Sequence, residues 1–410
     1  MIKFSFIALG CSKNTVDAEQ MLYILEQQGM KNVVTPDVAD VVIINTCGFI
    51  EAAKSEAIEN ILEMAELKEE GVLQKIVVTG CLAQRYREEI LTDLPEVDGV
   101  VGSASLGDIA QAVRDVMDGQ RICLVGDKDA PLVERQRVLS TPFYTAYVKI
   151  AEGCDNCCSY CAIPMIKGKF RSRELASIVD ECAALAKKGV REIILIAQDT
   201  TRYGLDLYGH RALGELIDAV CAIDDIVWVR LHYLYPDGFD ESLIKVIARQ
   251  NKVVKYLDIP MQHASDRLLS SMNRRYTEAD LRRLLATLRA AIPGVVLRTS
   301  LIVGYPGESE QDFEVLCRFL KDAKIDRVGA FAYSAEEGTA AALLPQQVEE
   351  SLKQSRLETV YTLQADIMED YNRACIGKTM TVLNDGYDEL CEVYAGRSFA
   401  DSPDIDGRVF

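Results

Sequence analysis

The stretch "EGCDNCCSYCAIP", residues 152–164, carries four cysteines within eight residues. Cys154, Cys158 and Cys161 are spaced C-x3-C-x2-C, and such a loop can hold three irons of a [4Fe–4S] cluster while the fourth iron stays open for a ligand that is not protein. Zinc is the alternative metal, but structural zinc sites separate their two cysteine pairs by roughly a dozen residues or more. The spacing therefore predicts an iron–sulfur cluster, with Cys157 as a bystander.

The composition is that of a globular chain with more than one domain. Its 410 residues exceed what a single core usually serves, and 49% are hydrophobic against 26% charged. No apolar run is long enough to span a bilayer, and the N-terminus does not read as a signal peptide. We therefore expect a cytoplasmic protein without a membrane anchor. Its thirteen cysteines are interpreted as thiols, cluster ligands or core residues, not as disulfides.

The net charge of −18 bears on possible partners. Nucleic-acid affinity rests on clustered Lys and Arg, so the charge gives no sign of a broad phosphate-binding surface. A basic protein partner fits this charge better, and a local basic groove is the alternative.

The first part of the chain has the pattern of an α/β domain with a parallel sheet. Over residues 1–120, short β-rich runs alternate with amphipathic helices predicted at Val16–Gln28, Glu51–Lys68 and Leu106–Met117. The periodicity then fades into a polar segment, residues 121–142, which we interpret as a linker.

A second alternating region covers residues 143–376. Six strand–helix units predict a parallel sheet, an open or partial (β/α)6 barrel with its site at the carboxyl ends of the strands. Residues 347–376 read as one long helix. Residues 377–410 alternate like the start of a small β-barrel module, and the chain ends before such a module could close, so we expect an unpaired, disordered edge there.

The N-terminal domain supplies a second set of three cysteines. Cys11, Cys47 and Cys81 each follow a predicted strand and precede a predicted helix. In a parallel sheet such positions converge along one edge, where helix N-termini favour thiolates. A lone cysteine is more often a small core residue. Three in the same structural position favour a second cluster with an open iron.

The C-x3-C-x2-C loop after a strand, opening six strand–helix units, resembles the radical S-adenosylmethionine (SAM) superfamily. With the N-terminal set, the whole chain resembles the methylthiotransferase family of that superfamily. The resemblance implies two [4Fe–4S] clusters, held by the six cysteines as metal ligands and catalytic residues, and SAM both as methyl donor and as source of a 5′-deoxyadenosyl radical. It also implies a sulfur donor, a reducing electron donor and a final β-barrel module known as TRAM.

Two branches of that family share this chemistry, one acting on a modified adenosine of tRNA and the other on a ribosomal protein. The stretches "ALGCSKNTVDAEQM", "IAQDTTRYGLD", "LHYLYPDG" and "GRSFADSPDIDG" look like the protein-directed branch. That resemblance implies methylthiolation of the β-carbon of an aspartate on the twelfth protein of the small ribosomal subunit. Residues 378–410 hold seven acidic and three basic side chains, which suits a basic ribosomal protein. A solvated acidic surface is the plainer interpretation.

The resemblance also directs attention to polar residues that could bind SAM. Gln198 and Arg298 are the favoured contacts, Tyr160 resembles an aromatic residue beside the cluster, and His263 follows a buried run. Loop packing is the alternative for Tyr160, and a structural sheet-end histidine for His263. The weaker candidates are Asp199, Arg230, His232, Gly304, Gly307, Arg171 and Arg173. A non-catalytic ribosome- or RNA-binding iron–sulfur protein is the alternative of another class.

Overall fold

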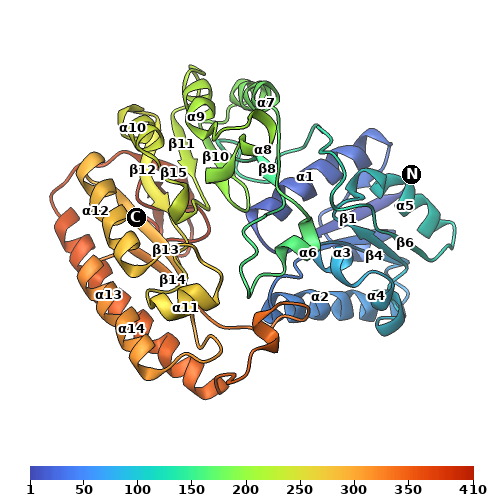
Figure 1. The fold of residues 1–410 in the computed structure, drawn as a ribbon. Coiled ribbons are helices and arrows are strands. Elements are labelled where there is room, and N and C mark those ends of the chain that lie inside the picture. The colour runs from blue at the N-terminus through green and yellow to red at the C-terminus, as the bar shows by residue number, and fades with distance from the viewer.

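The N-terminal domain is a six-stranded parallel sheet with helices on both faces, coloured blue to teal in Figure 1. The computed structural model describes residues 1–410. The strand order is β2-β1-β3-β4-β5-β6, so the direction of strand addition reverses beside β1. The strands are β1 (Lys3–Ala8), β2 (Lys31–Asn32), β3 (Val41–Thr46), β4 (Lys75–Gly80), β5 (Gly99–Gly102) and β6 (Ile122–Leu124). The helices are α1 (Ser12–Gln27), α2 (Glu51–Glu69), α3 (Cys81–Tyr86), α4 (Glu88–Asp93) and α5 (Ile109–Met117).

Two apolar cores flank this sheet. Helices α1 and α5 pack on one face through residues such as Leu25 and Val113, and α2 and α3 pack on the other through Ile61 and Leu82. Strand β3 is buried along its whole length, as expected where helices cover both faces of a parallel sheet. The predicted α/β domain is confirmed.

The element boundaries differ from the sequence prediction at two places. Helix α1 begins four residues before the predicted Val16, because residues 12–15 are polar and hide its first turn from the apolar periodicity. Strand β6 pairs with β5 inside the segment predicted as linker. The linker prediction was wrong at these three residues, since so short a run shows no alternation.

The second domain is an open barrel of six parallel strands wrapped by helices (Figure 1). The strand order β7-β10-β11-β12-β13-β14 follows the chain, and the edge strands β7 and β14 do not pair with each other. The strands are β7 (Thr145–Lys149), β10 (Glu192–Ile196), β11 (Trp228–Leu231), β12 (Val253–Asp258), β13 (Val296–Val303) and β14 (Arg327–Ala332). The main helices are α7 (Leu175–Lys187), α9 (Leu213–Cys221), α10 (Glu241–Arg249), α12 (Glu278–Ala291), α13 (Glu310–Ala323) and α14 (Glu350–Cys375). The predicted partial (β/α)6 barrel is confirmed.

The inner face of the barrel sheet is covered by segments from outside the barrel. Alternate residues of a strand point to opposite faces, so Ile194 and Ile196 of β10 turn away from the core beneath the helices and pack with Val16 of α1. Farther along the sheet, Tyr256 of β12 packs with Ala400 near the C-terminus. The N-terminal domain and the C-terminal tail thus share the inner face.

The last residues form a hairpin and a docked tail. Strands β15 (Val382–Asp388) and β16 (Val393–Ser398) pair antiparallel. The tail that follows contacts the barrel, where the Tyr256 hydroxyl donates to Asp406 at 2.6 Å, and Val409 bridges back to Gly396. The expected unpaired edge was therefore wrong for the tail side of β16. Assignment of the hairpin to a TRAM-type module stays a prediction. None of the helices combines the length and apolar character that a membrane crossing needs.

Candidate active site at the domain interface

The three spaced cysteines of the opening stretch lie on one loop between β8 (Ala151–Glu152) and α6 (Ile163–Lys167). The loop begins with Gly153 at φ +78°, where an added Cβ would lie 2.0 Å from the carbonyl oxygen of Lys169. Only glycine fits there. Cys157 is exposed, whereas Cys154, Cys158 and Cys161 are partly buried. The loop thus separates the three spaced thiols from the bystander.

Burial makes these thiols reluctant to ionise. Desolvation raises the pKa of Cys154 to about 11, and it also raises the pKa of Cys161, with the neighbouring loop cysteines adding to both shifts. Such thiols keep their protons at neutral pH unless a bound cation compensates the thiolate charge. The donor set is therefore one that a metal centre would complete.

The second set converges from three adjacent strands. Cys11 directly precedes α1, Cys47 follows β3, and Cys81 follows β4 as the first residue of α3. Because β1, β3 and β4 are neighbours in the sheet, their carboxyl ends meet at one edge. An added Cβ on Gly10 would lie 2.9 Å from the Cβ of Cys47, and one on Gly48 would lie 3.1 Å from the carbonyl carbon of Cys81.

The thiols of this set influence one another electrostatically. Burial raises the pKa of Cys81 to about 12, and the nearby Cys11 and Cys47 add to the shift, whereas Lys167 opposes it. The chain has no group of three His, Cys, Asp or Glu side chains close enough to surround a single metal ion. A tetrahedral zinc site needs such a group, whereas an iron–sulfur cluster binds each cysteine at a different iron.

The two cysteine sets face each other across the domain interface. Cys81 packs with Ala162 and Ile166, which lie directly after the cluster loop of the barrel domain. The loop after β14 also reaches the N-terminal domain, as Figure 1 shows beside α2. There Glu336 pairs with Arg85 at 2.8 Å and with Lys54 at 3.1 Å. Both contacts join the domains at the site.

A buried ion network lies at this interface. Lys149 forms close ion pairs with Asp17 of α1 and with Glu152, the latter at 2.6 Å. Lys167 pairs with Asp17 at 3.0 Å and lies 3.8 Å from Glu152. Burial alone would raise the pKa of Glu152, but Lys149 and Lys167 hold it well below its usual range. The network ties the helix after Cys11 to the strand before Cys154.

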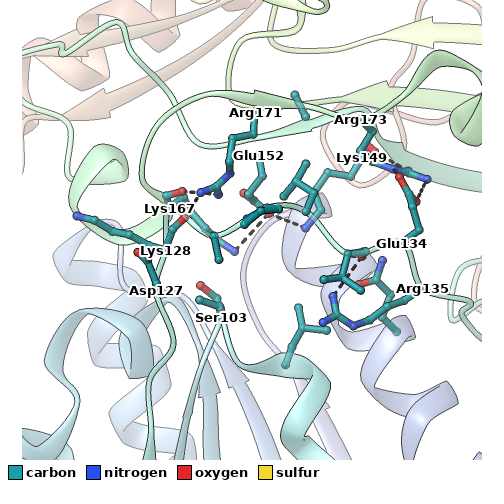
Figure 2. Close-up of a pocket in the computed structure, with 18 of the residues that line it drawn as sticks. Ser103, Asp127, Lys128, Glu134, Arg135, Lys149, Glu152, Lys167, Arg171 and Arg173 are labelled. Carbon is teal, nitrogen blue, oxygen red and sulfur yellow. Dashed lines mark hydrogen bonds and ion pairs between the residues drawn. The ribbon is translucent and has the colours of Figure 1, made fainter. Parts of the chain in front are cut away.

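The same network forms one wall of an interdomain cavity of about 160 Å³, drawn in Figure 2. Figure 2 shows Lys149, Lys167 and Glu152 above Ser103 of the N-terminal domain, with Glu134 and Arg135 of the linker at the side. Arg171 and Arg173 also reach this region. The linker therefore covers the ion network instead of spanning open solvent.

Gln198 has an unpaired buried acceptor, and its contact with SAM stays a prediction. It follows β10, and its Nε2 donates to Glu152 at 3.0 Å, while its Oε1 is buried without any hydrogen-bond partner. A buried amide oxygen without a partner is costly. This unpaired acceptor lies at the carboxyl end of β10, the strand next to β7 in the sheet. It fits a polar cofactor such as SAM.

Arg298 and Tyr160 are placed less decisively. Arg298 lies on the inner face of β13, where its guanidinium donates to Asp258 at 2.7 Å. Tyr160 packs beside Met272 and Tyr305, which is the loop packing considered as its alternative. Their roles at the cofactor stay predictions.

Three polar candidates have partners within the chain. His263 is fully buried, its Nδ1 accepts from the backbone N–H of Ser265, and its Nε2 has no hydrogen-bond partner. A SAM contact of His263 stays a prediction. Arg230 is also fully buried and pairs with Glu192 at 3.0 Å. His232 lies 3.0 Å from the Ser402 hydroxyl. The last two hold the C-terminal tail.

The remaining candidates are also engaged within the chain. Asp199 accepts from Asn156 at 2.7 Å and so braces the cysteine loop. Arg171 donates to backbone carbonyls, and Arg173 pairs with Glu134 and Glu181. A contact of either arginine with a carboxylate of SAM stays a prediction. Gly304 and Gly307 adopt φ +72° and +76° in a turn that Glu308 closes by accepting from the backbone N–H groups of Gly304 and Tyr305.

Comparisons with known proteins agree with this architecture. A model described as Uncharacterized protein family UPF0004 matches residues 3–102, and the Radical SAM superfamily model matches residues 148–320. The chain is 49% identical to the ribosomal protein uS12 methylthiotransferase RimO of Pelotomaculum thermopropionicum, covering 100% of this chain and 93% of that protein. The chain belongs to the RimO family. The RimO proteins of Desulforudis audaxviator and Geobacter sulfurreducens are 48% and 47% identical, over 100% of this chain and 90% and 92% of theirs.

Solved structures support the fold alone. The radical SAM methyltransferase TsrM from Kitasatospora setae, with cobalamin and a [4Fe–4S] cluster bound, superposes with a TM-score of 0.58 at 16% identity, covering 80% of this chain and 74% of that one. The cobalamin-dependent radical enzyme OxsB gives 0.55 at 11% identity, covering 96% and 64%. Membership of the RimO family and the radical SAM match imply SAM and [4Fe–4S] clusters as cofactors.

Sequence reasoning missed the ion network between the cysteine sets. Asp17 is one of several charged residues of α1, and Lys149 ends a short strand, so no spacing in the sequence marks either as a partner in a buried network. Lys167 shows a weak signal, because it is the charged end of the apolar segment "AIPMI" after Cys161. A charge in that place suggests a buried partner.

Proposed function

We propose that this chain, like the RimO proteins it resembles, is a radical SAM methylthiotransferase that acts on ribosomal protein uS12. The modified atom is proposed to be the β-carbon of an aspartate. The methyl group and the radical would both come from SAM, and a sulfur donor and a low-potential electron donor would complete the reaction. Because the substrate is a ribosomal protein, we expect the enzyme in the cytoplasm.

The observation that carries the proposal is the pair of facing cysteine sets. We assign one [4Fe–4S] cluster to Cys154, Cys158 and Cys161. The other is assigned to the strand-end set, Cys11, Cys47 and Cys81. Each set offers three thiols, which leaves one iron of a four-iron cluster open. The contact of Cys81 with Ala162 and Ile166 supports a transfer between the two centres without release into solvent.

The chain's own residues have three tasks around these centres. Gln198 offers a buried acceptor to SAM, which supplies a radical when its sulfonium bond is cleaved by one electron. Lys167 and Lys149, with Asp17 and Glu152, hold the two domains together. The buried network and the linker exclude water from the space between the sets, which protects a reactive intermediate.

Charge supports a basic protein substrate over RNA, although less strongly at the C-terminus than composition alone indicates. Of the seven acidic residues after position 377, Asp385 and Asp401 pair with Arg397 and Arg327, and Asp406 accepts from Tyr256. The acidic residues left for a partner are Asp388, Glu389, Glu392 and Asp404. Methylthiolation of a tRNA adenosine stays the second candidate, because the chemistry is the same.

The test is metal analysis joined to product analysis. We would reconstitute the native chain and a Cys11→Ala/Cys47→Ala/Cys81→Ala variant without oxygen, then measure iron and acid-labile sulfide. About eight irons should fall to about four in the variant. The native protein, given SAM, sulfide and reductant, should add the mass of SCH2 to uS12 and not to tRNA.

The outcomes separate the candidates. Mass gain on tRNA alone would move the chain to the tRNA branch. About four irons in both proteins would remove the second cluster and with it methylthiotransfer. Two clusters without SAM cleavage under reducing conditions would favour a non-catalytic iron–sulfur protein.

A further inference from the structure

A short segment after α11 (Asp266–Ser271) supports the cysteine loop of the barrel domain. The backbone N–H of Ser159 donates to the carbonyl of Met272 at 3.1 Å. The side chain of Asn273 donates to the carbonyl of Cys157 at 2.8 Å, and Asn273 itself adopts φ +57°. A left-handed conformation is uncommon outside glycine but tolerated by asparagine. Residues 271–274 thus form a platform on which the loop rests.

Arg274 ends this platform and is buried in an unusual environment. It is 7% exposed, its Nη2 donates to the carbonyl of Pro260 at 2.9 Å, and its Nε has no hydrogen-bond partner. Its guanidinium carbon lies 4.6 Å from the ring centre of Tyr235 and 5.7 Å from that of Tyr276. These rings attract a cation, but they carry no charge.

The other buried arginines have carboxylate partners, and Arg274 does not. Six arginines are buried, and five of them have a carboxylate within ion-pair distance. The five pairs are Arg137 with Glu19, Arg230 with Glu192, Arg327 with Asp401, Arg356 with Glu308 and Arg397 with Glu192. Arg274 is the exception. A buried cation without an anion is strongly unfavourable, so a negative charge is expected beside it.

The neighbours of Arg274 identify that charge. The ionisable groups around it are Tyr160, Tyr276, Cys158 and Tyr235. The three tyrosines are neutral at pH 7, because a phenol ordinarily ionises near pH ~10. Cys158 is the one group among the four that becomes an anion when a metal centre binds it.

We propose that Arg274 is a positioning residue whose fixed positive charge compensates the cluster held by Cys154, Cys158 and Cys161, and so raises the reduction potential of that cluster. This inference rests on the proposed function, because it needs a cluster on that loop. Reduction by dithionite adds one electron to the cluster and makes it more negative by one unit. A nearby cation favours the more negative state, and a buried one is screened little by solvent.

The test measures potential, which a purely structural residue would not change. In the Cys11→Ala/Cys47→Ala/Cys81→Ala background a single cluster should remain, so its electron paramagnetic resonance signal can be titrated with dithionite and redox mediators. We would compare Arg274→Gln, which removes the charge, with Arg274→Lys, which keeps it. Arg356→Gln is the matched control, because Arg356 is equally buried and lies 5.2 Å from the Phe313 ring, away from the cysteine loop.

We expect Arg274→Gln to lower the equilibrium constant for reduction at least tenfold, about 59 mV for one electron. Arg274→Lys should stay within a third of that shift, and Arg356→Gln should lower thermal stability without changing the potential. Loss of iron in Arg274→Gln that Arg274→Lys restores would also support the proposal. An unchanged potential in Arg274→Gln, or equal loss of iron in both Arg274 variants, would overturn it. A background protein without iron would instead contradict the cluster assignment itself.

Discussion

The two cysteine sets reach similar arrangements by opposite routes. Cys154, Cys158 and Cys161 lie within eight residues on one loop, whose shape depends on Gly153 and on the platform at residues 271–274. Cys11, Cys47 and Cys81 are separated by 34–36 residues and meet only because β1, β3 and β4 are neighbours. The first set depends on local backbone geometry, the second on the register of a whole sheet. We therefore expect different substitutions to disrupt the two cysteine sets.

The largest effects should come from removing one ligand of each set. Cys158→Ala should abolish reductive cleavage of SAM and all product. Cys47→Ala should leave SAM cleavage in place and abolish only methylthiolation, because the radical centre is intact. Chromatography of SAM cleavage products and mass spectrometry of uS12 measure the two steps. Equal loss of SAM cleavage in both variants would break the division of labour between the sets.

Glycine substitutions test the two routes next. Gly153→Ala places a Cβ against the Lys169 carbonyl, and Gly80→Ala, at φ +96°, places one 2.4 Å from Asn45 Oδ1. Each forces an unfavourable left-handed conformation, about 1–2 kcal/mol, and adds a clash. We expect about half of the iron to be lost in either case, from the barrel loop or from the sheet edge respectively.

A matched glycine provides the control for this pair. Gly119 adopts φ +87° with nothing within 4 Å of an added Cβ, so Gly119→Ala meets the conformational cost without the clash. It should lower the melting temperature slightly and keep all iron. If Gly119→Ala loses as much iron as Gly80→Ala, backbone strain alone explains the effect.

The third prediction concerns what holds the sets opposite each other. Asp17→Asn removes the carboxylate that pairs with both Lys149 and Lys167. Breaking a buried ion pair costs about 3–5 kcal/mol of stability. We expect the two domains to unfold in separate calorimetric transitions. Asp98→Asn is the control, since Asp98 also pairs with two lysines, Lys68 at 2.6 Å and Lys75 at 3.0 Å, but within the N-terminal domain. A single transition in Asp17→Asn would show that apolar contacts suffice.

The smallest effect on iron content should come from His232, which lies 3.0 Å from the Ser402 hydroxyl of the C-terminal tail. Burial lowers the pKa of His232 to about 3, so the unfolded chain binds its proton near pH 6.5 while the folded chain stays neutral. Its contribution is fully present above about pH 6.5 and falls by up to about 1.4 kcal/mol per pH unit below it. His232→Gln should flatten this dependence between about pH 6 and pH 4, measured by urea unfolding, with iron content unchanged.

The exposed His210 separates this effect from general acid sensitivity. His210→Gln should leave the slope below pH 6.5 as it is, because the His210 ring is more than half exposed. If both histidine variants flatten the curve alike, the tail contact of His232 is not its source.

The sequence predicted the frame of the site, but it did not show which polar residues pair within the chain. The cysteine spacing and the three strand-end positions marked both sets, because each signal lies within one element. Arg230 and His232 followed apolar runs in the same way as Gln198, yet they hold the C-terminal tail whereas Gln198 keeps an unpaired oxygen. Position after a strand does not reveal which segment covers the inner face.

By itself, the sequence determined the number and order of strand–helix units, the two sets of cysteines and the net charge of −18. These properties depend on periodicity, spacing and charge, which are local. Only the tertiary structure decided that α1 and residues 399–406 cover the inner face, that Asp17 meets Lys149 and Lys167, and that Arg274 lies without a carboxylate beside the cysteine loop. Those contacts join residues more than a hundred positions apart, so they depend on how the whole chain folds and no local pattern in the sequence marks them.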